Sequence, residues 1–153
     1  MESKTKSKKI YRKAFFCVTY RKDKNKILYL IQKRKMHWKG WEFPKGGIEG
    51  KEKILQTIKR EIKEETGQAP SNIKSYPIQG KYKYSKPIKA RPNIIGQTFK
   101  LFSAELKKEK VKLDKLEHSA YKWLEFNKAI KILTYPNQRR CLRIVDKKIK
   151  KDL

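Results

Sequence analysis

Two short apolar runs near the start of the chain have the composition of β-strands. Residues 14–20 (AFFCVTY) and 27–34 (ILYLIQKR) are rich in aromatic and β-branched side chains. Residues 21–26 between them are polar and include an Asp and an Asn, which is typical of a turn. The pattern therefore predicts a β-hairpin over residues 14–34.

A helix is predicted over residues 51–66, where apolar side chains recur at helical spacing. The expected apolar stripe consists of Ile54, Leu55, Ile58 and Ile62. Gly67 follows the last turn, and a glycine suits the left-handed backbone that often ends a helix. The helix is thus expected to bury one face and to stop at Thr66.

The rest of the chain alternates between strand-like and helix-like segments. Residues 72–80, 94–106 and 120–124 have the character of strands, and residues 127–133 and 137–150 have helical spacing. Strands that lie before, between and after helices favour an α/β fold, in which helices cover a mixed sheet. The chain has 153 residues and no internal repeat or linker, so one domain with one core is expected.

Loops are predicted where helix and strand breakers or charges gather. Residues 37–50 contain a proline and several glycines, residues 81–91 are basic and rich in tyrosine, and residues 107–115 are highly charged.

The formal net charge of +27 is extreme for a chain of this length. Such a surface attracts polyanions, including nucleic acids. The chain is rich in lysine throughout, however, and such a background gives the same charge without any polyanionic partner. Charge alone therefore leaves contact with RNA open.

No apolar run is long enough to cross a membrane or to form a signal peptide, which predicts an intracellular, cytoplasmic protein without a membrane partner. Residues 1–10 are expected to be a basic tail ahead of a domain at residues 11–150. Cys17 and Cys141 form no CxxC pair, and Cys17 lies in an apolar run, so it is expected to be buried and reduced.

Six of the 15 acidic residues are concentrated in one stretch of this basic chain: Glu42, Glu49, Glu52, Glu61, Glu64 and Glu65. At about 100° per residue, Glu65 falls inside the apolar stripe, Glu61 at its edge and Glu64 on its flank. Carboxylates at a buried boundary repel one another and lose hydration, and a divalent cation such as Mg²⁺ removes that conflict. A solvated acidic helix end, paired with Lys59 and Lys63, has the same pattern. The helical positions alone therefore leave open whether these acids bind a cation or form surface ion pairs.

The spacing around these acids is that of a known motif. The chain reads Gly46-x5-Glu52-x7-Arg60-Glu61-Ile62-x-Glu64-Glu65-x-Gly67. This matches the Nudix box and resembles the Nudix hydrolase family, which implies a single α/β/α sandwich with a mixed central sheet. It also implies Mg²⁺ as cofactor, with Mn²⁺ as an alternative. The position after Gly67 is usually aliphatic in the family and is Gln68 here, which puts local packing in question.

The resemblance assigns roles to the matched residues. The metal ligands would be Glu61, Glu64, Glu65 and the main-chain carbonyl of Lys45. Arg60 would orient the carboxylates, and Glu52 would help to hold Arg60 or the loop. Family members often recruit a further acid from a late loop, and the segment from Leu116 to Trp123 has that shape. Glu117 is therefore the predicted extra ligand or general base, with Glu105 as its rival.

Three flanking segments are similar to the asymmetric diadenosine tetraphosphate hydrolase group: residues 37–46, 117–124 and 133–139. They favour hydrolysis of a dinucleoside tetraphosphate to ATP and AMP. Gly47 and Ile48 depart from that group and are similar to RNA 5′-pyrophosphohydrolases, so removal of pyrophosphate from RNA ends, or a decapping-type activity, is the alternative. A catalytically silent RNA-binding module is a third, which the intact acids argue against. Oligomeric state, metal number and base preference stay open.

Substrate contacts are expected from residues beside the box and in two aromatic segments. Lys45 is placed to meet a phosphate, and glycines at 46 and 47 allow close approach of the backbone. The other candidates, for phosphate contact or base stacking, are His37, Tyr82, Lys83, Tyr84 and Tyr121.

Overall fold

Strand β1 (Ile10–Asp23) runs through the middle of one mixed sheet. The computed structural model describes residues 9–36 and 39–153, and within them the sheet has seven strands. The others are β2 (Lys26–Arg34), β3 (Gly40–Glu42), β4 (Lys45–Gly47), β5 (Ser71–Lys83), β6 (Ile94–Glu105) and β7 (His118–Leu124). Strand β1 pairs in parallel with β6, whereas the other pairings are antiparallel.

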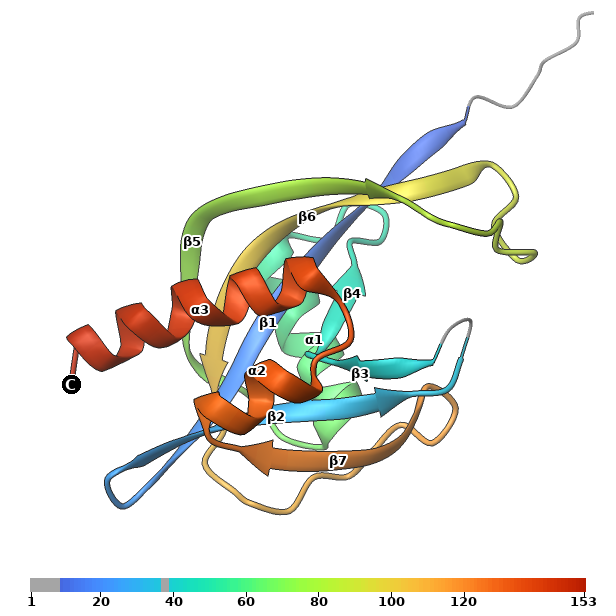
Figure 1. Cartoon of the computed structure of the whole chain (residues 1–153). Helices are drawn as coiled ribbons and strands as arrows, with labels where there is room; N and C mark the ends of the chain where they lie inside the picture. Colours follow the sequence, from blue (N-terminus) through green and yellow to red (C-terminus); the bar gives the residue numbers. More distant parts are fainter. Residues whose placement is uncertain (1–8, 37–38) are drawn as a thin grey trace, which may run out of the picture.

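Helices cover both faces of this sheet. Helix α1 (Ile54–Thr66) lies on one face, and α2 (Phe126–Ile132) and α3 (Pro136–Lys151) lie on the other (Figure 1). Each interface has its own core, one around α1 and one around α2 and α3. The structure thus confirms the predicted α/β/α sandwich with a mixed sheet.

The apolar run in β1 explains why both faces are covered. Phe15 and Cys17 point into the core beneath α1, and Phe16 and Val18 point into the core beneath α2 and α3. Successive side chains of a strand point to opposite faces, so a run that is apolar at every position needs cover on both sides. Full burial of a side chain such as Phe15 contributes about 1.5–3 kcal/mol.

Helix α1 ends where the sequence predicts but begins three residues later. Lys53 has extended backbone, and its N–H donates to Gln56 Oε1 at 3.2 Å, which sets the start of the helix at Ile54. Gly67 has φ 78° and its N–H donates to Lys63 O, so the predicted left-handed end is confirmed. Leu55 was wrongly placed in the apolar stripe, since it is 50% exposed.

Two predicted loops are partly strand. Residues 37–50 contain β3 and β4, which are three residues each and too short to show an alternating pattern. Strand β5 continues to Lys83, into the predicted loop at 81–91, because its backbone pairs with β6 as far as Gly96. The two strands form a ribbon that projects beyond the rest of the sheet (Figure 1).

Strand β1 begins at Ile10, earlier than the predicted residue 14, and the polar residues at its start pair with β6. Pairing with a neighbouring strand, which polarity alone does not reveal, decides this boundary. Cys17 and Cys141 are both buried and free, as expected for Cys17. None of the helices within residues 9–36 and 39–153 is long and apolar enough to cross a membrane.

Candidate active site

The three acids of α1 differ in exposure in the order that the helical wheel predicts. Glu65 is 1% exposed, whereas the side chain of Glu61 is 15% exposed and that of Glu64 is 54% exposed. The helix therefore presents a row of carboxylates that runs from the core to the surface.

Arg60 ties this row to the segment ahead of the helix. Its Nε and Nη2 donate to the two carboxylate oxygens of Glu52, both at 2.9 Å. Its Nη1 donates to Glu61 Oε1 at 3.0 Å and to Glu64 Oε2 at 3.3 Å. The hydrogen bond from Arg60, with one from Thr57, lowers the pKa of Glu52 to about 2. Arg60 thus holds Glu61 and Glu64 in fixed positions, in the arrangement that the family resemblance implied.

Strand β4 passes close to α1 because Gly46 has no side chain. A Cβ at residue 46 would lie 2.7 Å from Glu61 Cγ, which is closer than real Cβ atoms come to other atoms. The glycine therefore lets the backbone that follows Lys45 touch a predicted metal ligand.

The substitution Gly46→Ala is expected to displace Glu61 and to lower turnover roughly 10–100-fold, the range found when the support of a metal ligand is disturbed. Steady-state rates at several Mg²⁺ concentrations measure the effect. Gly50→Ala is the control, since nothing lies within 4 Å of its added methyl group, and it should cost only about 1–2 kcal/mol of backbone strain. Equal Mg²⁺ dependence in the two variants would contradict a positioning role for Gly46.

The loop that follows β6 returns Glu117 to the buried end of the row. Carboxylate oxygens of Glu65 and Glu117 and a ring nitrogen of His118 all lie within 4.8 Å of one another. Arg34 Nη1 lies 3.8 Å from Glu117 Oε2. Glu117 and Arg34 line a cleft, and Glu105, the rival candidate, does not.

Glu65 is the observation that tests whether a cation fits here. Both of its carboxylate oxygens are buried, and neither has a hydrogen-bond partner within residues 9–36 and 39–153. Burial, with the nearby charges of Glu117, Glu61 and Glu42, raises the pKa of Glu65 well above its usual value. An unsatisfied buried acid is costly, and a hard divalent cation held by oxygen atoms relieves that cost. The oxygen-rich donor set fits Mg²⁺ or Mn²⁺.

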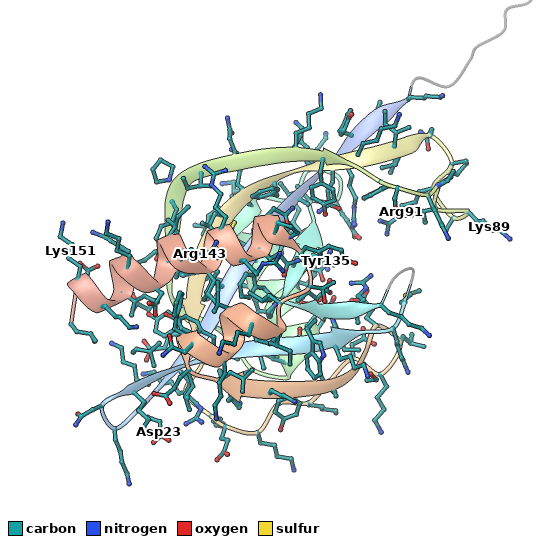
Figure 2. The ribbon with its side chains drawn as sticks, viewed as in Figure 1. Asp23, Lys89, Arg91, Tyr135, Arg143 and Lys151 are labelled. Carbon is teal, nitrogen blue, oxygen red and sulfur yellow. The ribbon has the colours of Figure 1, made fainter. Side chains whose placement is uncertain are left out.

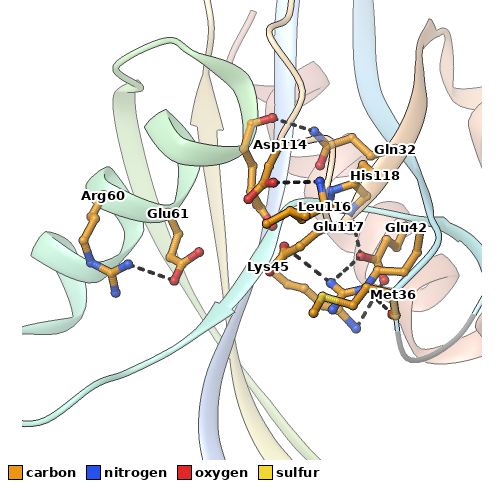
Figure 3. A network of polar contacts seen from close by, with 12 residues as sticks. Gln32, Met36, Glu42, Lys45, Arg60, Glu61, Asp114, Leu116, Glu117 and His118 are labelled. Carbon is orange, nitrogen blue, oxygen red and sulfur yellow. Dashed lines mark hydrogen bonds and ion pairs between the residues drawn. The ribbon is translucent and has the colours of Figure 1, made fainter.

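A second buried acid, Glu42, anchors a cationic network beside the first (Figure 3). Its carboxylate is 0% exposed and lies 3.3 Å from Arg34 Nη1, 3.3 Å from Lys45 Nζ and 3.0 Å from His118 Nε2. Burial alone would raise the pKa of Glu42, but these three partners lower it to about 2. Glu42 is therefore ionised, and its carboxylate accepts a hydrogen bond from His118 Nε2.

Sequence reasoning missed this network, although Glu42 was noted as part of a motif. Its members come from β2, β3, β4 and β7, so they meet only through the register of the sheet. The one available signal was a carboxylate directly after an apolar strand residue, Trp41, in a lysine-rich segment.

Residues of both groups line one cleft of about 390 Å³. Its acidic residues include Glu61, Glu64 and Glu117, and its basic residues include Arg12, Arg34, Lys45 and Arg91. Such an arrangement suits a polyphosphate that meets cations on one side and acid-bound metal on the other.

Arg12 and Arg91 were not predicted as site residues. A side chain at Gly47 would overlap the guanidinium of Arg12, so the glycine makes room for this arginine. Burial and the charge of Arg91 lower the pKa of Arg12. Arg91 lies on the connection between β5 and β6, at the far end of the projecting ribbon (Figure 2). Two cations held this close favour an anionic ligand between them.

The predicted aromatic contacts separate into different environments. Tyr84 lines the cleft, and its hydroxyl donates to Gln97 Oε1 at 2.9 Å. Tyr82 lies in β5 and packs near Phe16 and Phe99, with both ring centroids 6.4 Å from its own. The structure therefore brings only Tyr84 of this pair to the cleft.

Lys83 is exposed and does not line the cleft. Tyr121 packs against the core beneath α1, and its hydroxyl accepts a hydrogen bond from Val111 N at 3.3 Å. His37, another predicted contact, lies outside the described residues, and so does Trp38.

Comparisons with known proteins agree with this geometry. The family model of the NUDIX domain matches residues 10–144. The chain is 31% identical to an RNA pyrophosphohydrolase of Alkalilimnicola ehrlichii over 104 residues, which are 61% of this chain and 58% of that protein. It is 32% identical to an RNA pyrophosphohydrolase of a Nitratiruptor species over 115 residues, which are 72% of this chain and 74% of that protein. The chain thus spans less than two thirds of the length of the first relative.

Solved structures give the same fold. A Caenorhabditis elegans Ap4A hydrolase in a binary complex superposes with a TM-score of 0.72 at 28% identity, over 91% of this chain and 98% of that chain. The NUDIX domain of Shewanella oneidensis NrtR, solved with ADP ribose, superposes with a TM-score of 0.75 at 16% identity, over 96% and 94% of the two chains. At that identity the second likeness concerns the fold alone.

Proposed function

Because this chain belongs to the Nudix family, we propose that it is a divalent-metal-dependent pyrophosphohydrolase that cuts a phosphoanhydride bond in the polyphosphate of a nucleotide. One observation carries the proposal: the buried, unsatisfied carboxylate of Glu65 lies beside Glu117, which lines a cleft that also contains several basic side chains. The acids would hold the cation, and the cations would hold the polyphosphate.

The acidic residues would bind the cation together, and Arg60 positions two of them. Glu61, Glu64, Glu65 and the carbonyl of Lys45 would bind the cation, and Arg60 fixes the first two of these carboxylates. When bound, a divalent cation would neutralise charge on the phosphates and lower the pKa of a water molecule, so that hydroxide becomes available as the nucleophile. Glu117 would either complete the ligand set or accept the proton of that water.

The basic residues of the cleft would orient the substrate. Arg12 and Arg91 would bind phosphates at one end of the cleft, and Arg34 would bind near Glu117. Charge develops on the bridging and terminal oxygens as the phosphoanhydride bond breaks, and fixed cations stabilise that charge without having to reorganise. Tyr84 lies where a base can stack on its ring at the edge of the cleft.

A dinucleoside tetraphosphate, cut to ATP and AMP, is the first candidate substrate. The late segment with Glu117 and the residues that lead into the box resemble the asymmetric diadenosine tetraphosphate hydrolase group, and the C. elegans Ap4A hydrolase is similar over nearly its whole length. The five basic residues of the cleft suit a chain of several phosphates.

The 5′-triphosphate end of RNA is the second candidate. Gly47 replaces the histidine that often follows the Lys-Gly pair in the first group, and the space is filled by Arg12. The curated relatives described above are RNA pyrophosphohydrolases. This substrate would lose pyrophosphate and keep a 5′-monophosphate.

A turnover panel separates the candidates. Incubation with Mg²⁺ and diadenosine tetraphosphate should release ATP and AMP, and incubation with 5′-triphosphorylated RNA should release pyrophosphate. The ratio of kcat/KM for the two substrates ranks them. If neither substrate, nor any free nucleoside triphosphate, is hydrolysed while RNA still binds, the catalytic proposal is wrong and a silent RNA-binding domain remains.

A further inference from the structure

A second hollow, outside the cleft, lies at the end of α1 where the Nudix motif departs from its usual residue. It has a volume of about 540 Å³, and half of its ten lining residues are lysines. We call these five residues the lysine hollow: Lys63, Lys107, Lys108, Lys110 and Lys112. All five are exposed, and no acidic side chain lines the hollow.

Gln68 holds the loop that carries four of these lysines. Its Nε2 donates to Lys108 O at 2.8 Å and to Lys110 O at 2.9 Å, and its Oε1 accepts from Lys108 N at 3.1 Å. An aliphatic residue at this position could make none of these bonds. The departure from the motif therefore has a structural consequence, which is a fixed basic loop.

Further bonds fix the same loop along its length. Lys112 N donates to Thr66 O at 2.8 Å, and Trp123 Nε1 donates to Glu109 O at 2.7 Å. Val111 is buried beneath the loop. The loop has no regular secondary structure, so these contacts keep the backbone atoms of its lysines from moving apart.

The charge of the lysine hollow is not balanced locally. None of its five lysines forms an ion pair within residues 9–36 and 39–153. Glu109 is the one acid between residues 107 and 113, and it does not line the hollow. Like charges held together by a rigid loop repel one another, and a polyanionic ligand turns that repulsion into binding energy.

We propose that the lysine hollow binds the phosphate backbone of RNA and guides the 5′ end into the cleft. The inference rests on the proposed function, and it concerns the second candidate substrate. The loop that begins at the hollow ends at Glu117, and the five residue steps from Lys112 to Glu117 span at most about 18 Å. Lys115, which is exposed, lies between them and continues the basic path.

Phosphate backbone fits the hollow better than a membrane or an acidic protein surface. An amphipathic membrane anchor combines basic residues with a set of apolar side chains, and Leu116 is the one large exposed apolar residue of this loop. Binding of RNA backbone needs only regularly placed cations and is independent of sequence.

Binding of an RNA oligonucleotide with a 5′-hydroxyl tests the proposal without any hydrolysis. The variant carries glutamine at positions 107, 108, 110 and 112, and dissociation constants are measured over a range of salt concentrations. For single strands the slope of log K against log salt changes by about 0.7 per phosphate contact, so the slope should become shallower by up to about 3. Affinity at low salt should fall by one to two orders of magnitude.

A matched control removes four lysines elsewhere. Lys22, Lys26, Lys128 and Lys131 are exposed and lie in the β1–β2 hairpin and on α2, so their change to glutamine alters the net charge equally. The control should keep most of the wild-type slope. Equal loss in both variants would show that only overall charge matters, and would overturn the proposal. Vesicles that contain phosphatidylserine serve as a second probe, and lysine-dependent binding to them without RNA binding would also overturn it.

The substitution Gln68→Leu separates the position of the lysines from their charge. It restores an aliphatic residue and keeps all five lysines, and we expect RNA affinity to fall several-fold while hydrolysis of diadenosine tetraphosphate, if present, is unchanged. Unaltered RNA affinity would show that the hydrogen bonds of Gln68 do not position the lysines for binding.

Two outcomes separate this inference from the proposed function. If the four-lysine variant loses RNA binding but the wild-type protein hydrolyses no substrate, the RNA-binding surface is supported and the proposed activity is wrong. If the wild-type protein hydrolyses its substrate but RNA binding does not depend on the four lysines, the proposed activity is supported and the RNA-binding surface is wrong.

Discussion

Replacing Glu65 by glutamine should lower turnover by roughly three orders of magnitude, about 4 kcal/mol of transition-state stabilisation, and should stabilise the metal-free protein at the same time. The first effect follows from loss of an anionic ligand next to Glu117. The second follows because both oxygens of this buried side chain are unsatisfied and burial opposes its ionisation, whereas a neutral amide has a smaller desolvation cost. A residue kept only for folding would not show opposite effects on activity and stability.

The stability of the metal-free protein should change with pH in a direction that the pKa of Glu65 determines. Burial raises the pKa of Glu65 in the folded state above its unfolded value near 4.5. As the pH rises past 4.5, the unfolded chain loses this proton before the folded protein does, so stability falls with rising pH until the folded pKa is passed. Thermal unfolding with a chelator between pH 5 and pH 8 should show this decline in the wild-type protein and a smaller one in Glu65→Gln. Added Mg²⁺ should raise the wild-type Tm and leave the variant nearly unchanged.

Glu64→Gln is the matched control. Its side chain is half exposed, and its contact with Arg60 is a surface ion pair worth about 0–1 kcal/mol, so metal-free stability should hardly change. Turnover should still fall by orders of magnitude, because Glu64 is also a predicted ligand. Near-normal turnover in both variants would refute the metal assignment, and an unchanged Tm in Glu65→Gln would refute the buried, unsatisfied carboxylate.

What the sequence predicted well depends on local geometry. A helix repeats every 3.6 residues, so the exposure of Glu61, Glu64 and Glu65 followed from their positions relative to Ile58 and Ile62. The family motif added the link from Arg60 to its acids, which the structure shows as short hydrogen bonds.

What the sequence did not predict depends on pairing between distant segments. Glu42 meets His118, 76 positions later, because β3 and β7 lie beside the end of β2, where Arg34 pairs with both Gly40 and His118. No periodicity encodes that register. The position of Tyr82 differs from the expected loop for the same kind of reason: its basic, polar surroundings indicated a loop, but pairing with β6 makes it part of a strand that does not line the cleft.

Gln68 shows how a departure from a motif can carry information. The sequence indicated only that packing after Gly67 would differ from that of relatives. The structure shows that the side chain bonds to a loop 40 residues away, which no local pattern reveals. The lysines at 107–112 were expected to be an ordinary charged stretch, and it is their fixed arrangement that distinguishes them.

Replacing Glu42 by glutamine should have the largest effect on stability, a loss of about 3–5 kcal/mol in the free energy of unfolding. The carboxylate is fully buried and contacts Arg34, Lys45 and His118, so its neutralisation removes the buried negative charge closest to the Arg34 and Lys45 cations. Urea unfolding at pH 7 measures the change. Glu117→Gln is the control, since that side chain is 32% exposed and lies 3.8 Å from Arg34, and it should cost less than about 1 kcal/mol.

The contribution of Glu42 to stability should also depend on pH, in the opposite direction to that of Glu65. Because the pKa of Glu42 is lowered to about 2 in the folded protein, its stabilising contribution is present above pH 4.5 and is lost as the pH falls from 4.5 towards 2. Acid unfolding of the wild-type protein should therefore be steeper in this range than that of Glu42→Gln, whose stability is already reduced at pH 7. Added Mg²⁺ should not restore the full stability of the variant, since Glu42 holds Arg34 and Lys45 and is not expected to bind the metal. A loss below about 1 kcal/mol at pH 7, with parallel acid unfolding curves, would mean that the charges at Arg34 and Lys45 are balanced by other groups.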